Sequence, residues 1–248
     1  MILSALCVVD KGFGRRLMMR TVCVIPALNE EPTIGRIVSE ARRHCDMVLV
    51  VDDNSQDGTA ELSRQNGAIV IRHVLRLGTG GALSTGFKAA LEEGFQALVT
   101  IDGDGQHDPN EIPTVLNPIL KDEADVVIGS RRLKKSGSTP LLKWIGNRAL
   151  SIATSFASGT KITDSQSGFR AYRREVLEHA IHKAWDYRWA SEILLLAAKA
   201  NFRIKEVPIT QIYLHKRHRG TDIKDGFKIL YSTIKPPEKP EPSRESKT

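Results

Sequence analysis

The chain has 248 residues, of which 41% are hydrophobic and 26% are charged, values typical of a globular protein with a sizeable core. Together with the lack of any run of about 18 apolar residues, they exclude general disorder and an integral membrane protein. The 36 lysines and arginines exceed the 29 acidic residues, and the net charge of +7 favours an anionic partner: a phosphorylated ligand, a membrane surface or a nucleic acid.

The cysteines and the first residues bear on the compartment. Cys7, Cys23 and Cys45 are odd in number and show no Cys-x-x-Cys spacing, which supports neither a disulfide framework nor a zinc site and favours a reducing compartment. Met1–Val9 is apolar, but the positive charges follow the apolar run, which is the wrong order for a signal peptide. We therefore expect residues 1–20 to be an N-terminal extension.

The first half of the chain alternates short apolar strands with helical patterns. Strands are expected at Thr21–Pro26, Met47–Val51, Ala68–Ile71, Ala97–Ile101 and Asp125–Ile128. Helices are expected at Thr33–His44, Thr59–Asn66, Gly81–Gly94 and Pro109–Lys121. Apolar strands without polar alternation, separated by helices of about a dozen residues, predict an α/β fold: a mostly parallel, Rossmann-like sheet with helices on both faces. In such sheets ligands bind beyond the carboxyl ends of the strands.

The second half is less regular. The expected segments are a basic loop at Arg131–Thr139, a peripheral amphipathic stretch at Leu141–Phe156, an apolar helix at Ala190–Ala200 and a strand at Val207–Tyr213. The amphipathic stretch has two interpretations, a helix that covers the sheet or a helix that lies in a membrane interface. The chain end is rich in proline and charge, which predicts disorder. We expect one folded domain over residues 21–232 and a disordered tail over 233–248.

Crowded acidic and amide side chains follow the fourth expected strand. Asp102 and Asp104 flank Gly103, so the two carboxylates can share one hard cation while the glycine lets phosphate oxygens approach the backbone. Gln106 can supply a neutral oxygen, and such an all-oxygen site suits Mg²⁺ or Mn²⁺. The alternative is an Asp/Gly-rich turn, but crowding acids beyond a buried strand is unfavourable unless a cation offsets it. His107 is expected at the surface or behind the metal ligands.

Two further loops follow strands. Asp52 and Asp53 stand at the tip of the second strand, where a carboxylate can accept hydrogen bonds from a base or a ribose. Asp57 and Thr59 are expected to cap the following helix. Glu30 has two interpretations, a ribose ligand or a first-turn helix charge.

The segment Gly78–Gly81 is glycine-rich but carries neither the Gly-Lys-Ser/Thr of a phosphate loop nor the spacing of a dinucleotide fingerprint. It is expected to be a tight loop before a helix.

Seven motifs stand in a fixed order along the chain. They are VIPALNEE, VVDDNSQDGT, GGALSTGF, TIDGDGQHDP, DVVIGSR, DSQSGFRAY and KEVPI. This ordered set, which spans about Thr21 to Tyr231, resembles the family 2 glycosyltransferases, and within them the polyprenyl-phosphate (dolichyl-phosphate) mannosyltransferase and glucosyltransferase branch. The resemblance implies a GT-A type fold, a nucleotide-sugar donor, a polyprenyl-phosphate acceptor and a divalent metal.

The resemblance also implies roles for residues near the donor. The nucleoside pocket would be lined by Pro26, Leu28, Glu30, Val51 and Asp53. Leu28 stands where many relatives carry tyrosine. The metal and the sugar diphosphate would be held by Asp102, Gly103, Asp104 and Gln106, with Asp104 at the reacting centre.

Three arginines are implied at the phosphates. Arg131 would meet the phosphates at the reacting centre, and Arg148 and Arg217 would bind the acceptor phosphate. Relatives often carry Arg-x-x-Gly-x-Ser-Lys late in the chain. Here Arg217 and Gly220 match its start, whereas Asp222-Ile223 replaces the Ser-Lys.

The chemistry of such a reaction brings two anions together. A metal is needed at the diphosphate leaving group and arginines at the phosphate nucleophile. Because the acceptor phosphate is already ionised, no general base is required, and we expect in-line displacement with inversion. Mannose from GDP-mannose is favoured, with UDP-glucose or another family 2 acceptor as the alternative. If the acceptor is a hydroxyl, Asp164 and Glu192 are the candidate bases, although a structural role is favoured for both.

Two other classes of function compete with this one. A sugar nucleotidyltransferase shares the layered fold, but it usually has a basic glycine-rich loop where this chain has PALNEE. A non-catalytic basic module would leave Asp102 and Asp104 unexplained.

For an enzyme with a polyprenyl-phosphate acceptor, the expected location is cytoplasmic, peripheral at the cytoplasmic face of the membrane. No nucleic-acid partner is expected, and a separate membrane subunit is left open. The basic run His215–Arg219 is expected to contact phosphate or membrane rather than to be a solvated loop.

Overall fold

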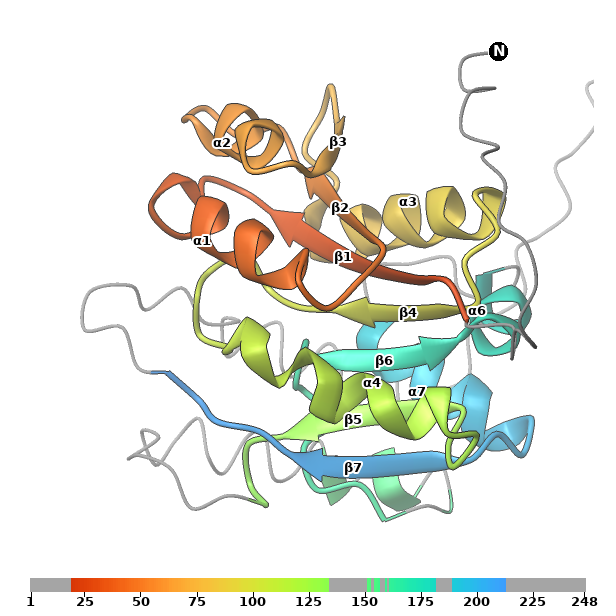
Figure 1. Ribbon diagram of the computed structural model, residues 1–248. Helices are drawn as coiled ribbons and strands as arrows, with labels where there is room; N and C mark the ends of the chain where they lie inside the picture. Colours follow the sequence, from red (N-terminus) through yellow and green to blue (C-terminus); the bar gives the residue numbers. More distant parts are fainter. Residues whose placement is uncertain are drawn as a thin grey trace, which may run out of the picture.

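Seven strands form one sheet in the order β3-β2-β1-β4-β6-β5-β7 in the computed structural model (Figure 1). The structure describes residues 19–133, 151–152, 154–156, 159, 161–181 and 189–212. The strands are β1 (Thr21–Ala27), β2 (Met47–Asp52), β3 (Ile69–Arg72), β4 (Ala97–Thr100), β5 (Val126–Ser130), β6 (Arg170–Arg173) and β7 (Ile204–Pro208). The helices are α1 (Glu31–Ala41), α2 (Thr59–Gln65), α3 (Gly78–Glu92), the 3₁₀ helix η1 (Pro109–Glu111), α4 (Ile112–Leu120), α6 (Arg174–Ile181) and α7 (Trp189–Lys199).

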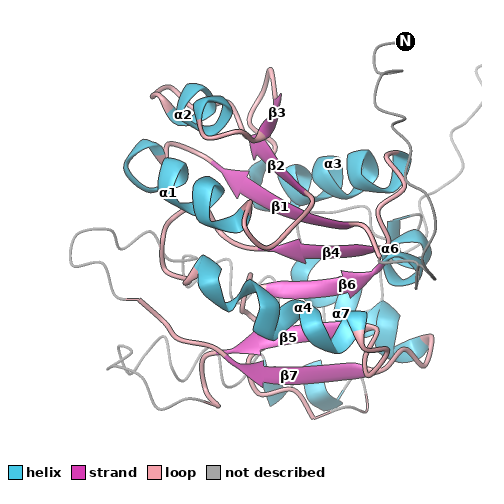
Figure 2. Ribbon diagram, in the orientation of Figure 1, coloured by secondary structure: helices cyan, strands magenta, loops and turns pink. Residues whose placement is uncertain are grey.

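Helices cover both faces of the sheet, as the sequence predicts (Figure 2). On one face Ile37 of α1 and Val115 of α4 pack into a buried apolar cluster with the strands. On the other face Phe87 of α3, Leu177 of α6 and Leu194 of α7 form a second cluster. The inner strands β1, β2, β4 and β5 are buried almost throughout, which explains why their sequences are nearly continuous apolar runs. Within the described residues, no helix is both long enough and apolar enough to cross a bilayer.

The sheet is mostly parallel, with one reversed strand. β3, β2, β1 and β4 are parallel neighbours, and β5 is parallel to β7. Between these two groups β6 runs antiparallel to both β4 and β5. The start of β6 therefore lies at the edge where the other strands end, which Figure 1 shows as one arrowhead pointing against the rest.

Two expected elements differ from the observed ones, and two observed elements were not expected. β6 and α6 were not predicted, and β7 begins at Ile204 rather than Val207 and ends at Pro208, because main-chain pairing with β5 sets its limits. The expected loop at Gly78–Gly81 is wrong: α3 begins at Gly78. The helix starts there because the Asp53 carboxylate accepts hydrogen bonds from the main-chain N–H groups of Leu77 and Gly78, both at 2.7 Å.

An ion-pair network lies at the edge of the sheet opposite the carboxyl ends of the parallel strands, and it makes the fold sensitive to acid. The Asp125 carboxylate accepts hydrogen bonds from Arg203 Nε at 3.0 Å and Nη2 at 2.9 Å, and Arg173 Nε lies 3.3 Å from it. The bonds from Arg203 hold the pKa of Asp125 below its ordinary value of about 4. A lowered pKa adds stability above that ordinary value, and this stability is lost as the pH falls through the folded-state pKa.

We expect Asp125→Asn to flatten the loss of unfolding free energy below about pH 4, measured by urea denaturation at stepped pH. An unchanged acid limb would contradict this assignment.

Candidate active site

The loops after β1 and β2 are bound to each other at the carboxyl edge of the sheet. Asn29 N donates to Ser55 Oγ at 2.9 Å, and Gln56 N donates to Asn29 Oδ1 at 2.8 Å. Asn29 and Asn54 adopt positive φ values of 55° and 67°, a conformation that asparagine tolerates better than most residues. Hydrogen bonds between residues far apart in sequence thus hold the two loops together.

Side chains from these loops also hold the starts of α1 and α2. Thr59 Oγ1 accepts from Glu30 N at 2.8 Å, and Glu31 Oε2 accepts from Gly58 N at 3.0 Å. Asp57 Oδ1 accepts from Thr59 N at 3.0 Å, so both residues are structural as expected, but the N-cap of α2 is Gly58 and the Thr59 hydroxyl holds the start of α1 rather than capping α2. Glu30 is the N-cap residue of α1, just before the first helical residue, and its main-chain carbonyl accepts the first helical bonds.

The acidic loop after β4 lies against the loop after β1. Thr33 Oγ1 of α1 donates to Gly103 O at 2.6 Å. A Cβ atom added at Gly103 would lie 3.3 Å from Pro26 O and 3.5 Å from Glu30 Cγ. The structure therefore brings Pro26 and Glu30, two of the expected nucleoside contacts, next to the expected diphosphate loop, and Leu28 is half-buried between them.

Two other expected nucleoside contacts are placed differently. Val51 is fully buried on β2, facing Gly86 of α3. Asp53 is 3% exposed and is engaged by the protein: besides anchoring the start of α3, its Oδ1 lies 2.8 Å from His73 Nδ1. His73 Nε2 in turn lies 2.9 Å from Thr85 Oγ1. In this arrangement Val51 belongs to the core and Asp53 anchors α3.

Asp102 and Asp104 form an electrostatically coupled pair. Burial, and then the negative charge of Asp102, raises the pKa of Asp104 above its ordinary value. Burial also raises the pKa of Asp102, but the bond with His107 and the charges of Arg131 and Arg170 outweigh it, so this pKa lies below its ordinary value. Two neighbouring carboxylates that disfavour each other's charge are the arrangement that a cation would stabilise.

Gln106 and His107 fix these carboxylates from within the same loop. Gln106 donates to Asp104 through its main-chain N at 3.0 Å and through Nε2 at 2.5 Å. Gly105 has φ of 79°, which lets the loop turn so that this happens. His107 is 3% exposed, with Nε2 3.7 Å from Asp102 Oδ2. The expected surface position of His107 is therefore wrong, and the residue lies beside Asp102, one of the two carboxylates predicted to bind the metal.

Gly168 was given no role by the sequence, yet it contacts Asp102. A Cβ atom added to Gly168 would lie 2.7 Å from Asp102 Oδ1 and closer still to Oδ2. The main chain cannot retreat easily, because Gly168 O accepts a hydrogen bond from Thr100 Oγ1 at 2.8 Å. Gly168 lies in the DSQSGFRAY motif just before β6, so the reversed strand delivers it to the carboxyl edge.

Arg131 follows β5 and is held by Asp164. Arg131 Nε and Nη2 donate to the two Asp164 oxygens, both at 2.7 Å, and Arg131 N donates to Oδ2 at 3.1 Å. Burial raises the pKa of Asp164, but the bonds from Arg131 outweigh it and hold the pKa below its ordinary value. Asp164 thus has the structural role favoured for it rather than that of a base. Glu192 stands in the first turn of α7.

The remaining acceptor-side residues lie largely outside the described part of the chain. Arg148, Arg217 and the run His215–Arg219 are among them. Of the amphipathic stretch, residues 151–152 and 154–156 are described as helical, with Ile152 59% exposed and Phe156 92% exposed.

The described residues fit a hard, oxygen-binding cation that would take part of its coordination shell from substrate. They contain no group of three or more histidine, cysteine, aspartate or glutamate side chains able to enclose a metal ion by themselves. Mg²⁺ usually binds through one or two carboxylates together with substrate phosphates and water. The pair Asp102 and Asp104, in the loop packed against Pro26 and Glu30, matches that requirement.

Comparison with known proteins identifies relatives of this arrangement. The sequence model of Glycosyl transferase family 2 matches residues 22–180. A UDP-N-acetylglucosamine–dolichyl-phosphate N-acetylglucosaminyltransferase of Methanococcus voltae is 38% identical over 234 residues, covering 85% of this chain and 93% of that protein. The polyprenol monophosphomannose synthase of Mycolicibacterium smegmatis is 32% identical over 235 residues, covering 89% and 86%.

A solved structure shares the fold. Glucosyl-3-phosphoglycerate synthase from Mycobacterium tuberculosis, in complex with Mn²⁺ and UDP-glucose, superposes with a TM-score of 0.65 at 22% identity, covering 87% of this chain and 77% of that one.

Proposed function

This chain is a glycosyltransferase that belongs to Glycosyl transferase family 2, and we propose that it transfers a sugar from a nucleotide-sugar to a polyprenyl phosphate. The observation that carries the proposal is the coupled pair Asp102 and Asp104 beside the first-strand loop, with Arg131 in the neighbouring half of the sheet. The GT-A type α/β fold is shared with a solved nucleotide-sugar enzyme. Relatives that cover most of this chain are named for polyprenyl- or dolichyl-phosphate acceptors.

The residues have distinct parts in the proposed reaction. A divalent cation, Mg²⁺ or Mn²⁺, bound by Asp102, Asp104 and the Gln106 side-chain oxygen would offset the charge of the diphosphate leaving group. Pro26, Leu28 and Glu30 lie where a nucleoside would meet the diphosphate loop. Two hydrogen bonds to Asp164 fix the orientation of the Arg131 guanidinium, which could then bind an anionic oxygen of the acceptor phosphate.

Bond making and breaking then follow from the charges. An oxygen of the acceptor phosphate forms a bond to the anomeric carbon while the bond from that carbon to the nucleoside diphosphate breaks, which inverts the configuration. The acceptor phosphate is ionised near neutral pH, so no side chain needs to remove a proton. This agrees with Asp164, the former base candidate, being held ionised by Arg131.

The donor sugar is a finer part of the proposal. GDP-mannose is the donor that the sequence pattern favours. The Methanococcus voltae relative has the greater identity to this chain, 38% against 32%, and this favours UDP-N-acetylglucosamine instead. We place UDP-N-acetylglucosamine first, with GDP-mannose and UDP-glucose as the competing donors.

The acceptor is a membrane lipid, so the enzyme is proposed to act at the cytoplasmic face of the membrane as a peripheral protein. The exposed Ile152 and Phe156 lie one helical turn apart and can enter the lipid interface. The positive net charge favours the same surface. Whether a separate membrane subunit takes part is tested by activity of the purified chain alone.

The test is a panel of radiolabelled nucleotide-sugars incubated with polyprenyl phosphate and Mn²⁺ or Mg²⁺, followed by organic extraction. We expect label in the lipid fraction with one donor, lost when EDTA is added and restored by excess metal. Lipid-linked label that persists in EDTA would contradict the metal. An unlabelled lipid fraction with every donor, in the presence of membranes as well as detergent, would contradict the acceptor.

A further inference from the structure

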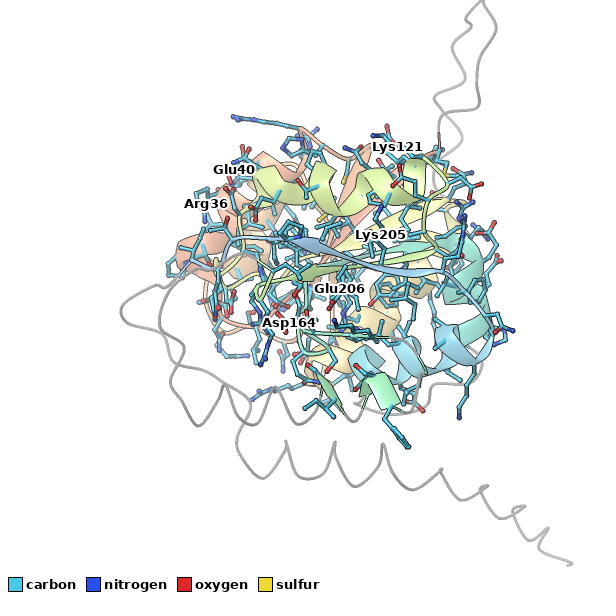
Figure 3. The ribbon with its side chains drawn as sticks, turned by 90° about the horizontal axis from the view of Figure 1, so that it is seen from below. Arg36, Glu40, Lys121, Asp164, Lys205 and Glu206 are labelled. Carbon is cyan, nitrogen blue, oxygen red and sulfur yellow. The ribbon has the colours of Figure 1, made fainter. Side chains whose placement is uncertain are left out.

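Glu206 of β7 contacts the main chain of the segment that carries Asp164. Its Oε1 accepts hydrogen bonds from Thr163 N at 2.9 Å and from Asp164 N at 3.0 Å. Glu206 is 43 positions from Thr163 and 42 from Asp164 in sequence, and it reaches them because β7 pairs with β5. Figure 3 shows Glu206 on the same side of the β7 ribbon as Asp164, with Lys205 on the other side. One carboxylate oxygen therefore fixes two consecutive N–H groups of a loop.

The loop so fixed leads directly to Arg131. The Asp164 carboxylate receives Arg131 Nε and Nη2, and Thr163 Oγ1 lies 2.9 Å from Ser130 Oγ, the residue before Arg131. The main chain leading to Arg131 is held separately, because Ser130 pairs with Pro208 in the parallel register of β5 and β7. Arg131 thus has a fixed backbone, while the direction of its guanidinium depends on where Asp164 lies.

Charge and reach both suit the Glu206 carboxylate to this contact, and reach decides whether one oxygen meets both N–H groups. Hydrogen bonds from N–H groups to an ionised acceptor are roughly twice as strong as those to a neutral one. The reach of the side chain matters as well, because the acceptor must sit within about 3 Å of both N–H groups. A glutamine keeps the reach and loses the charge, whereas an aspartate keeps the charge and loses the reach.

We propose that Glu206 is a positioning residue for Arg131: by binding the N–H groups of Thr163 and Asp164, it sets the direction in which the guanidinium meets the acceptor phosphate. Glu206 itself touches no substrate in this account. The inference rests on the proposed function, since it assigns the acceptor phosphate to Arg131. Nothing in the KEVPI motif by itself gives Glu206 this role, because the contact depends on the β5–β7 register.

The test compares Glu206→Ala, Glu206→Asp and Glu206→Gln with the wild-type enzyme, using the donor found in the panel and polyprenyl phosphate. We expect the Ala and Asp variants to lose about tenfold in kcat/KM for polyprenyl phosphate while the KM for the donor stays within about twofold. The Gln variant should retain most of the wild-type value. The matched control is Glu123→Gln, which breaks the exposed Lys205–Glu123 ion pair of the neighbouring β7 residue and should leave both parameters unchanged.

The test depends on which of the Asp and Gln variants keeps the higher kcat/KM for polyprenyl phosphate. An Asp variant more active than the Gln variant would overturn the geometric role, and equal losses toward donor and acceptor in all three would indicate a merely structural one. If the Ala variant does not fold, the Asp and Gln pair still gives the comparison. The NMR resonance of Arg131 Nε–H supplies a readout without turnover: it should shift in the Asp variant and stay in the Gln variant. A wild-type chain with no transfer to polyprenyl phosphate would refute the proposed function, whereas an unmoved Arg131 resonance would refute this inference.

Discussion

Asp104→Ala is expected to lower the rate of sugar transfer at least about 10²-fold, because it removes one of two carboxylates proposed to hold the cation at the leaving group. The free energy of unfolding should not fall. Burial and the charge of Asp102 already raise the pKa of Asp104, so the folded protein holds this charge at a cost. Transfer is measured by extraction of lipid-linked label, and stability by urea denaturation of the same preparation.

The control for Asp104 comes from the same loop. The Asp108 carboxylate caps η1 by accepting a hydrogen bond from Asn110 N at 3.0 Å, and Asp108→Ser preserves a capping oxygen. This variant should keep its activity and its dependence on Mn²⁺ or Mg²⁺. Undiminished transfer by Asp104→Ala, or a loss as large in Asp108→Ser, would contradict the metal assignment.

Gly168→Ala is expected to lower transfer by about 10- to 100-fold while the chain remains folded, because a displacement of about 1 Å in a reacting group can cost that much. The new methyl group would overlap both oxygens of Asp102. The Asp102 carboxylate is the short, movable partner, whereas the Gly168 main chain is held by Thr100. The side chain should therefore turn away from its position beside His107, and the apparent affinity for the metal should fall with the rate.

A second glycine serves as the comparison for Gly168. A Cβ atom at Gly35 of α1 would meet only the amide end of Asn66, which can move aside. Gly35→Ala should leave transfer unchanged and slightly favour the helix, since alanine is the better helix former. A Gly168→Ala enzyme with wild-type rate and wild-type metal dependence would show that Asp102 tolerates displacement and would remove it from the ligand set.

The parallel part of the fold was predictable because its signals are local. Uninterrupted apolar strands and helices of about a dozen residues located β1 to β4 along the chain and placed Asp102 and Asp104 just past a strand end. The reversed strand was not predictable in the same way. β6 has the sequence RAYR, and Arg170, a charged residue, is only 1% exposed because Nε and Nη2 donate to the carbonyls of Ser167 and Ser165. Charge in a short segment usually indicates exposure, and here main-chain acceptors remove that signal.

The candidate site was predictable in position more than in the direction of its side chains. Looking beyond strand ends finds the acidic loop, but Gly168 lies before a strand and only an antiparallel neighbour brings it to the same edge. Asp53 stands at a strand tip as expected, yet its carboxylate binds Leu77, Gly78 and His73. The direction of the Asp53 side chain depends on contacts with residues 20 or more positions away. The sequence alone does not show these contacts.

The placement of β6 between β4 and β5 also bears on how the chain assembles during synthesis. β1, β2, β3 and β4 pair with one another, so this group can form its part of the sheet once it has left the ribosome. β5 pairs only with β6 and β7 among the described strands, and both are made later. β5 therefore has no partner strand until 43 further residues, from Ser130 to Arg173, have emerged. Pulse proteolysis of stalled nascent chains should find the strands β1 to β4 protected before β5 and the Arg131 that follows it.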